Sequence, residues 1–155
     1  HKTRSDTYRY AEMLTMGCSY NITEENKKDL YLKMNGRRLY QYALETVPLS
    51  IKACIDKAGV DISDVKKILI HQANGKMDDA IVDRLYKLYG YEEAPDDVMP
   101  MIISWLGNSS VATVPTLLDL ILKNKVADHK IEEGDLVIFA SVGAGMNINA
   151  AVYQF

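Results

Sequence analysis

The stretch Lys67–Asn74 constrains the fold of this chain more than any other segment. Val65–Ile70 has the apolar positions of a strand that is buried on both faces, as central strands are. His71 and Asn74 follow it directly, and a helix-patterned segment, Gly75–Leu88, begins at once. Functional residues of open α/β sheets collect where strands end and helices begin. The pattern therefore predicts an α/β fold with a candidate site at the end of this strand.

The remaining segments continue this alternation. Extended segments are predicted at Asp6–Gly17, Leu30–Met34, Val98–Ile103, Leu136–Val142 and Asn147–Phe155, and helices at Arg37–Ala58 and Val111–Asn124. Pro48 lies inside the first of these helices and predicts a kink, a break or two shorter helices. The order predicts a single domain of residues 1–155, with a central mixed sheet covered by helices and a terminal antiparallel β-hairpin.

Composition narrows the possible functions. Apolar residues make up 48% of the 155 residues and charged residues 25%, which is typical of a soluble globular domain. The net charge of -3 argues against a nucleic-acid partner. No apolar run has the length of a membrane span, and no signal peptide is visible. Two cysteines, Cys18 and Cys54, indicate neither a disulfide framework nor a metal site, so a cytoplasmic location is expected. The first residue, His1, is not methionine, so the chain can begin within a longer protein.

Two polar residues stand out as candidates for chemistry. His71 is either a structural residue at a strand end, with Asn74 as the helix N-cap, or a donor to a developing enolate. Asn108 lies in the same topological position, after a predicted strand and before a predicted helix. It either caps that helix, as Ser109 could, or provides a second donor beside His71.

Other candidates have plainer explanations. Cys54 falls on the apolar face of the long helix, which indicates a buried and inert thiol. Cys18 leads into a polar loop with no helix behind it to lower its pKa. Gly143–Gly145 is not followed by a helix, so a tight turn explains it better than a phosphate loop. No metal site is expected.

Four short motifs follow one another along the chain. They are Met-Asn-Gly-Arg at 34–37, His-Gln-Ala-Asn at 71–74, Gly-Asn-Ser-Ser at 107–110 and Val-Gly-Ala-Gly at 142–145. In this order and spacing they resemble the C-terminal half of β-ketoacyl-acyl carrier protein synthase III. The resemblance runs from about Leu30 to Phe155. It implies a thiolase-like fold of two similar halves, of which residues 1–155 are the second.

The resemblance also implies a reaction and roles for single residues. Members of this family perform a decarboxylative Claisen condensation of acyl-CoA with malonyl-acyl carrier protein, which initiates fatty acid biosynthesis, with a Cys-His-Asn triad and no cofactor. By resemblance, His71 and Asn108 are the catalytic histidine and asparagine, which stabilise the enolate of the malonyl thioester. Asn74 matches a position near the pantetheine arm. The resemblance further implies that the turn of Gly143, Ala144 and Gly145 supplies an oxyanion-hole N–H, that of Ala144.

The family's nucleophilic cysteine belongs to the first half, which is absent here. The resemblance therefore implies that residues 1–155 alone are inactive. The expected partners are the protein's own N-terminal half, acyl-CoA, acyl carrier protein and, at full length, a second copy in a homodimer. Lys76 stands where the family commonly has an arginine that engages the carrier protein.

The glycine-rich turn departs from the family pattern. Many members have Gly-Gly-Gly followed by a tryptophan and a further glycine, whereas this chain has Gly-Ala-Gly followed by Ile148 and Asn149. The acyl substrate therefore stays open. Two alternatives remain: a related acyltransferase or hydroxymethylglutaryl-CoA synthase-like enzyme, and a non-catalytic module that binds acyl-CoA or carrier protein.

Overall fold

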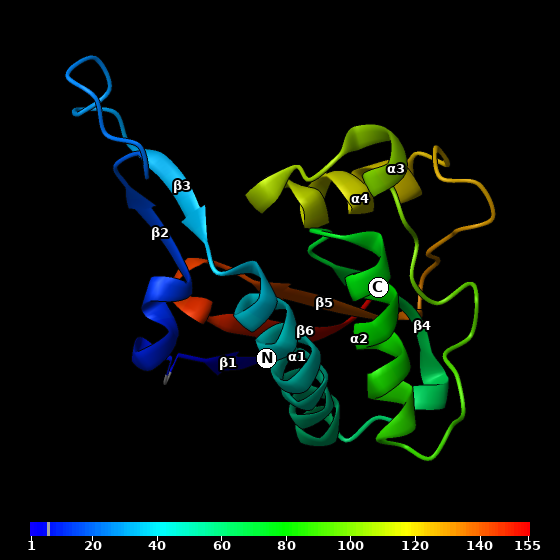
Figure 1. Cartoon of the computed structure of the whole chain (residues 1–155). Helices are drawn as coiled ribbons and strands as arrows, with labels where there is room; N and C mark the ends of the chain where they lie inside the picture. The colour runs from blue at the N-terminus through cyan, green and yellow to red at the C-terminus, as the bar shows by residue number, and fades with distance from the viewer. Residues whose placement is uncertain (6) are drawn as a thin grey trace.

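In the computed structural model, which describes residues 1–5 and 7–155, a four-stranded mixed sheet forms the centre of the molecule (Figure 1). Its strands are β1 (Lys2–Arg4), β4 (Val65–Ile70), β5 (Leu136–Val142) and β6 (Ile148–Gln154), in the order β1-β6-β5-β4. β4 and β5 run parallel, and the other pairs are antiparallel. The predicted mixed sheet and terminal β-hairpin are thereby confirmed.

Helices cover this sheet on two sides. They are α1 (Gly36–Ala58), α2 (Gly75–Lys87), α3 (Ile103–Leu106) and α4 (Thr113–Leu122), with 3-10 turns at Tyr8–Met13, Ile62–Asp64, Ser110–Ala112 and Ala144–Met146. Successive side chains of β4 point to opposite faces. Ile68 and Ile70 pack in the cluster that contains α1 and α2, whereas Leu69 packs in a second cluster with Leu117 and Ile121 of α4. Within the described residues, no helix combines the length and apolar character needed to cross a bilayer.

The long helix α1 is continuous despite its internal proline. Pro48 has no N–H, so the carbonyl of Leu44 loses its usual partner four residues on. Arg84 of α2 donates a hydrogen bond from Nη1 to this carbonyl at 3.3 Å. The predicted break does not occur. Gly59, with φ of 70°, ends the helix in the left-handed conformation that glycine adopts readily.

A second, two-stranded hairpin projects from the body of the molecule (Figure 1). Its strands are β2 (Leu14–Gly17) and β3 (Tyr31–Met34), which pair antiparallel. The prediction of one extended segment over Asp6–Gly17 holds for Leu14–Gly17 and is wrong for Tyr8–Met13, which forms a 3-10 helix. Asp6 itself lies outside the described residues.

The predicted strand at Val98–Ile103 is also wrong. The backbone of this segment makes one ladder-like bond to β4, from the Ile68 N–H to the Val98 carbonyl at 2.8 Å. Pro100 has no N–H, which prevents a regular ladder. Side chains hold the segment instead: the buried ammonium of Lys67 contacts Asp97, with Nζ to Oδ2 at 3.2 Å. β4 is therefore the edge of the sheet, and this segment covers it.

The carboxyl of Asp78, in the first turns of α2, is fully buried. Within the described residues neither of its oxygens accepts a hydrogen bond of normal geometry. Burial raises the pKa of this carboxyl to about 7; the backbone groups of Asn74 and Ala73 oppose this rise, and the negative charge of Asp79 adds to it. The folded chain therefore holds this proton up to near-neutral pH, whereas the unfolded chain releases it near pH 3.8.

The first prediction concerns this carboxyl. In the folded state the pKa of Asp78 is raised, so its ionisation should lower the free energy of unfolding as pH rises from about 4 to 7. We expect Asp78→Asn to increase the free energy of unfolding at pH 8 by roughly 2–4 kcal/mol and to have little effect at pH 4. Urea denaturation across this pH range measures both values. Asp96→Asn, which removes an exposed carboxylate, is the matched control. Equal pH slopes for wild type and Asp78→Asn would contradict the prediction.

Candidate functional site

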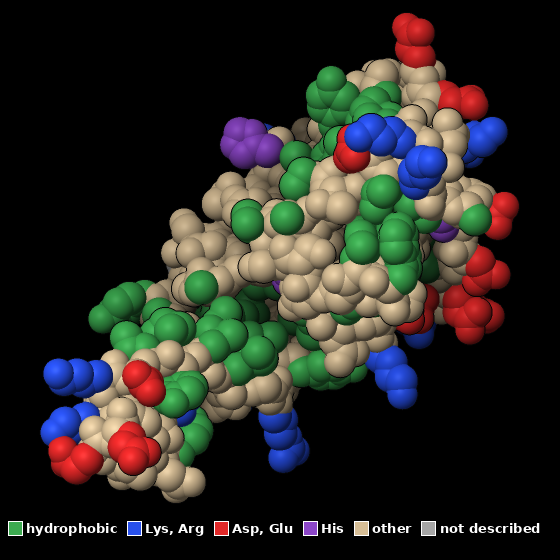
Figure 2. Space-filling view, turned by 90° about the horizontal axis from the view of Figure 1, so that it is seen from above, with side chains coloured by type: hydrophobic (Ala, Val, Ile, Leu, Met, Phe, Trp, Pro, Cys, Tyr) green, Lys and Arg blue, Asp and Glu red, His purple; other side chains and the backbone are tan. Residues whose placement is uncertain are grey.

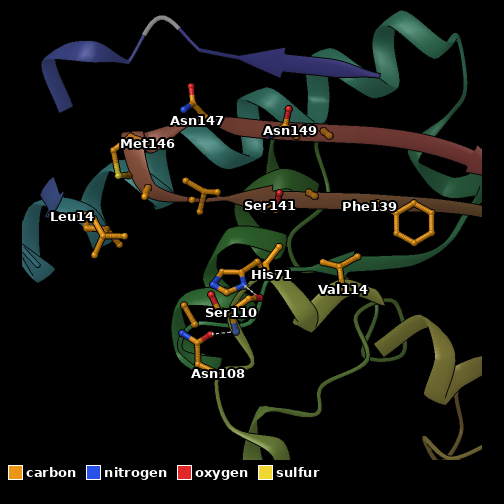
Figure 3. A pocket seen from close by; sticks show the side chains of 18 of the residues that line it. Leu14, His71, Asn108, Ser110, Val114, Phe139, Ser141, Met146, Asn147 and Asn149 are labelled. Carbon is orange, nitrogen blue, oxygen red and sulfur yellow. Dashed lines mark hydrogen bonds between the residues drawn. The ribbon is translucent and has the colours of Figure 1, made fainter. Parts of the chain in front are cut away.

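An open pocket with a volume of about 780 Å³ lies beside the ends of β4 and β5 (Figure 3). Figure 2 shows this side of the molecule, where hydrophobic side chains gather around a hollow. The lining includes polar residues and many apolar ones: His1, Thr3, His71, Asn108, Ser110, Ser141, Asn147 and Asn149 among the first, and Leu14, Leu32, Met34, Met77, Val114 and Phe139 among the second. The described lining residues include two histidines, His1 and His71, and no Asp, Glu, Lys, Arg or Cys.

His71 reaches the pocket because it continues the path of β4. Its backbone N–H donates to the Ala140 carbonyl at 3.0 Å, which extends the parallel pairing with β5 by one residue. By strand alternation its side chain emerges on the same side as Leu69, toward α4. Burial holds the pKa of the imidazole below its usual value, although the hydrogen bond with the Ser110 carbonyl opposes this shift. The ring is therefore neutral at pH 7.

Asn108 lies on the loop between α3 and the 3-10 turn at Ser110–Ala112. Its Oδ1 accepts a hydrogen bond from the Ser110 N–H at 2.9 Å, so the amide nitrogen Nδ2 stays available for another partner. Ala112, the N-cap position of α4, makes no side-chain capping bond, and neither does Ser109 at the preceding turn. Asn108 therefore does not cap α4 itself, although its bond to the first residue of the 3-10 turn Ser110–Ala112 is a local capping contact.

The backbone of Ser110 links the two candidate residues. Its carbonyl lies 3.1 Å from Nδ1 of His71, while its N–H bonds Asn108, as the dashed lines of Figure 3 mark. The buried hydroxyl of Thr113 also donates to this carbonyl, at 2.9 Å. Ser110 has φ of 54°, which is unusual for a residue other than glycine and costs of the order of 1 kcal/mol. Ser110 belongs to the Gly-Asn-Ser-Ser motif, but sequence reasoning assigned it no role, because it acts through backbone atoms.

This contact determines the tautomer of His71. A carbonyl oxygen only accepts, so the neutral ring must carry its proton on Nδ1. Nε2 then has a lone pair and is an acceptor. While Nδ1 keeps this partner, Nε2 donates a hydrogen bond only when the ring is protonated on both nitrogens. The sequence analysis predicts that His71 donates a hydrogen bond to an enolate. As long as Nδ1 stays bonded to the Ser110 carbonyl, Nε2 can do this only when the ring is protonated.

The glycine-rich turn also meets the pocket. Gly143 and Ala144 line it, whereas Gly145 does not. Among residues 1–5 and 7–155, nothing accepts a hydrogen bond from the Ala144 N–H. Gly145 has φ of 74°, and a Cβ there would lie 3.0 Å from Nδ2 of Asn147, so glycine is required on both grounds.

Two further predicted residues lie outside the pocket lining. Asn74 is the N-cap of α2: its Oδ1 accepts a hydrogen bond from the Met77 N–H at 3.3 Å, as the plainer interpretation predicts. Lys76 is exposed on the first turn of the same helix. The structure thus brings His71, Asn108, Gly143 and Ala144 together at the pocket. Asn74 and Lys76 lie outside the pocket lining, at the N-terminus of α2.

Neither cysteine belongs to this pocket. Cys54 is buried on α1 and its thiol contacts the Ala150 carbonyl at 3.3 Å, while Cys18 is exposed beyond β2. In the part of the chain that the structure describes, no group of three or more His, Cys, Asp or Glu residues is placed to hold a metal ion.

Two groups of pocket residues had no role in the sequence analysis. The first is the apolar face of the projecting hairpin, which contributes Leu14, its pairing partner Met34, and Leu32 to the lining. The second is a polar row across the sheet, in which Thr3 and Ser141 flank Asn149 and Thr3 Oγ1 donates to Asn149 Oδ1 at 2.9 Å. Both depend on strand register, which the local pattern does not reveal.

Solved structures with the same architecture define the class of protein. β-Ketoacyl-[acyl carrier protein] synthase III from Thermus thermophilus superposes with a TM-score of 0.76 and 28% identity, over 99% of this chain and 44% of that one. The priming β-ketosynthase of the R1128 polyketide pathway matches with a TM-score of 0.78 over 99% of this chain and 43% of its own, at 23% identity, which bears on the fold alone. The fold is the thiolase-like fold of condensing enzymes.

The sequence comparison is more specific. Residues 55–155 match the family model of the 3-oxoacyl-[acyl-carrier-protein] synthase III C-terminal domain, and the chain belongs to this family. The β-ketoacyl-[acyl-carrier-protein] synthase III of Oenococcus oeni is 32% identical over 148 residues, which cover 94% of this chain and 42% of the relative. That of Synechococcus elongatus is 34% identical over 122 residues, or 79% of this chain and 33% of the relative. The chain thus spans less than half the length of these relatives.

The second prediction tests the tautomer of His71. At pH 7.5 we expect a neutral ring with its proton on Nδ1, because the Ser110 carbonyl accepts there, and a pKa below the usual 6.5. Long-range ¹H–¹⁵N NMR spectra of the histidine rings report both the tautomer and its titration. His1→Ala and His129→Ala variants each remove one set of signals, so that together they assign those of all three histidines of residues 1–155. A proton on Nε2 in the neutral form would show that the ring has another partner in solution.

Proposed function

We propose that the full-length protein that carries this chain is a 3-oxoacyl-[acyl-carrier-protein] synthase III, which condenses acyl-CoA with malonyl-acyl carrier protein to begin fatty acid biosynthesis in the cytoplasm. The observation that carries the proposal is the convergence of His71 and Asn108 on Ser110 at one pocket wall. Membership of the family supports the same reaction class.

The proposed reaction uses the groups of the pocket in sequence. A cysteine thiolate attacks the acyl-CoA carbonyl, and the CoA thiolate leaves. The malonyl group then loses carbon dioxide, and its enolate carbon attacks the acyl thioester and releases the cysteine thiolate. Hydrogen bonds from His71 and Asn108 to the malonyl thioester oxygen stabilise the charge that develops as the enolate forms. The Ala144 N–H, which lacks a partner among the described residues, is suited to bind the oxyanion of the acyl thioester.

The nucleophile has to come from outside residues 1–155, because neither Cys18 nor Cys54 lines the pocket. We assign it to an N-terminal half, so residues 1–155 form a C-terminal domain that is inactive by itself. The apolar face of the hairpin, which is largely exposed at Leu32 and Met34, suits contact with such a half. A homodimer of the full-length protein belongs to the same proposal.

Two residues of α2 are proposed to contact the carrier rather than the reacting atoms. Asn74 and Lys76 lie at its N-terminus, next to the strand end that presents His71. An exposed lysine there offers positive charge to an acidic carrier protein or to its phosphopantetheine phosphate. No cofactor enters the proposed reaction, whose substrates are acyl-CoA and malonyl-acyl carrier protein.

The third prediction separates the proposed roles. In the full-length protein, His71→Ala and Asn108→Ala should each lower the rate of malonyl-thioester decarboxylation by roughly 10²–10³-fold, because each removes a donor to the developing enolate. Release of ¹⁴C-labelled carbon dioxide measures this rate. His129→Ala and Asn21→Ala are the matched controls, since both residues lie outside the pocket lining.

The products of this assay also discriminate between functions. A 3-oxoacyl product with release of carbon dioxide supports the synthase, whereas condensation of acetyl-CoA with acetoacetyl-CoA supports a hydroxymethylglutaryl-CoA synthase-like enzyme. Binding without turnover, together with a parent sequence that lacks an upstream cysteine, would instead indicate a non-catalytic module. Full decarboxylation in both alanine variants would refute the proposed roles of His71 and Asn108.

The fourth prediction follows from the Ser110 contact. While Nδ1 of His71 donates to that carbonyl, only the imidazolium donates from Nε2. The protonated fraction falls as pH rises above the lowered pKa of His71, so the decarboxylation rate should fall in the same range. A pH profile of kcat from about 5.5 to 8 measures this fall. The Asn108→Ala variant should be slower at every pH but should keep the same pH dependence, because it retains His71. A flat profile would mean that the neutral ring donates through Nε2, with its Nδ1 contact exchanged.

A further inference from the structure

Gln72 is a fully buried polar residue directly after His71, and neither the sequence analysis nor the proposed reaction gives it a role. Its Nε2 donates to the Pro100 carbonyl at 2.8 Å. Its Oε1 accepts from the N–H groups of Ile102 and Ile103 at 2.9 and 3.0 Å. One side chain thus satisfies three backbone groups of a segment that forms no regular ladder.

The place of these bonds along the chain gives them their importance. The backbone of His71 is fixed to β5 through the Ala140 carbonyl. The segment that Gln72 holds leads through α3 directly into the loop with Asn108 and Ser110. Lys67 ties the same segment to β4 farther back, at Asp97. Apart from the contact of the His71 ring with the Ser110 carbonyl, Gln72 is therefore the described side-chain tie closest in sequence to His71 that holds the segment leading to the loop with Asn108.

The chemistry at this position requires a planar group that accepts on one atom and donates on another, as an amide does. The two N–H groups need an acceptor, and the Pro100 carbonyl needs a donor on the same planar group. Methionine provides neither, and an ionised glutamate provides the acceptor but places negative charge against a carbonyl. A protonated glutamic acid offers a carbonyl oxygen and an O–H, so it can reproduce all three bonds.

We propose that Gln72 is a positioning residue that sets the separation of His71 and Asn108, and thereby the geometry of the two donors to the enolate. This inference rests on the function proposed above. Gln72 touches neither the substrate nor the pocket, since it is absent from the pocket lining. Its loss should shift the loop with Asn108 relative to His71. The step that needs both donors on one oxygen should suffer most, whereas acyl transfer to the cysteine of the other half should be largely preserved.

The test uses the full-length protein and measures the two half-reactions separately. Gln72→Met should lower kcat for malonyl-thioester decarboxylation about 10- to 100-fold, the range expected for a donor displaced by about 1 Å. Acylation of the cysteine by radiolabelled acyl-CoA should change less than about threefold. Gln154→Met is the matched control, because this exposed glutamine also donates to a backbone carbonyl, that of Gly134 at 3.3 Å, but far from the loop.

A second variant keeps the test decisive if Gln72→Met folds poorly. Gln72→Glu should resemble Gln72→Met at high pH and should regain decarboxylation relative to wild type as pH falls and the new carboxyl takes up a proton. Amide hydrogen exchange of Ile102 and Ile103 should follow the same pH dependence. A purely structural role would lower both half-reactions together, without this recovery, and would overturn the proposal. Wild-type decarboxylation in Gln72→Met would also overturn it. If His71→Ala decarboxylates normally, the proposed function fails instead, whatever the result for Gln72.

Discussion

The parallel pairing of β4 with β5 is the constraint on which the rest of the structure depends. Their register places Leu69 opposite Phe139 and Ile70 opposite Ala140, so the two strands end together. β4 is covered on both faces, by α1 and α2 on one side and by α4 on the other. A one-residue slip would turn every side chain of β4 to the wrong face, so burial fixes the register firmly. Because the register is fixed, so is the direction in which His71 leaves the strand.

Sequence patterns predicted those parts of the fold that local periodicity and burial decide. Val65–Ile70 was identified as a strand and Arg37–Ala58 as a helix, and both form with nearly the expected bounds. The prediction failed at Val98–Ile103, where the apolar residues suit a strand but Pro100 prevents a ladder. It also failed at Pro48, because the compensating donor, Arg84, comes from a different helix. Tertiary contacts decided both cases, and no local pattern contains them.

The candidate site divides in a similar way. His71 and Asn108 could be selected from sequence because the pattern placed each after a predicted strand and because the motifs resemble a family. Asn108 in fact follows the short helix α3 and not a strand, so only His71 lies at a true strand end. The structure places them on one pocket, although the roles assigned to them remain proposals. Ser110 could not be found, since its contribution comes from the N–H and C=O that every residue has. Gln72 did leave a signal: a glutamine that continues a buried strand must find several partners, because an unsatisfied buried amide is costly.

The two sides of the pocket differ in how firmly this chain holds them. The polar side is over-determined: Ser110 bonds His71, Asn108 and Thr113, and the segment before it is tied to the end of β4. The apolar side is a two-stranded hairpin, and Leu32 and Met34 expose 64% and 55% of their surface. Isolated hairpins have little stability of their own, whereas donors fixed before the substrate arrives need no rearrangement during reaction. Under the proposed function, a partner that covers the hairpin would therefore add apolar wall and the nucleophile to a pocket whose polar side this chain already holds in place.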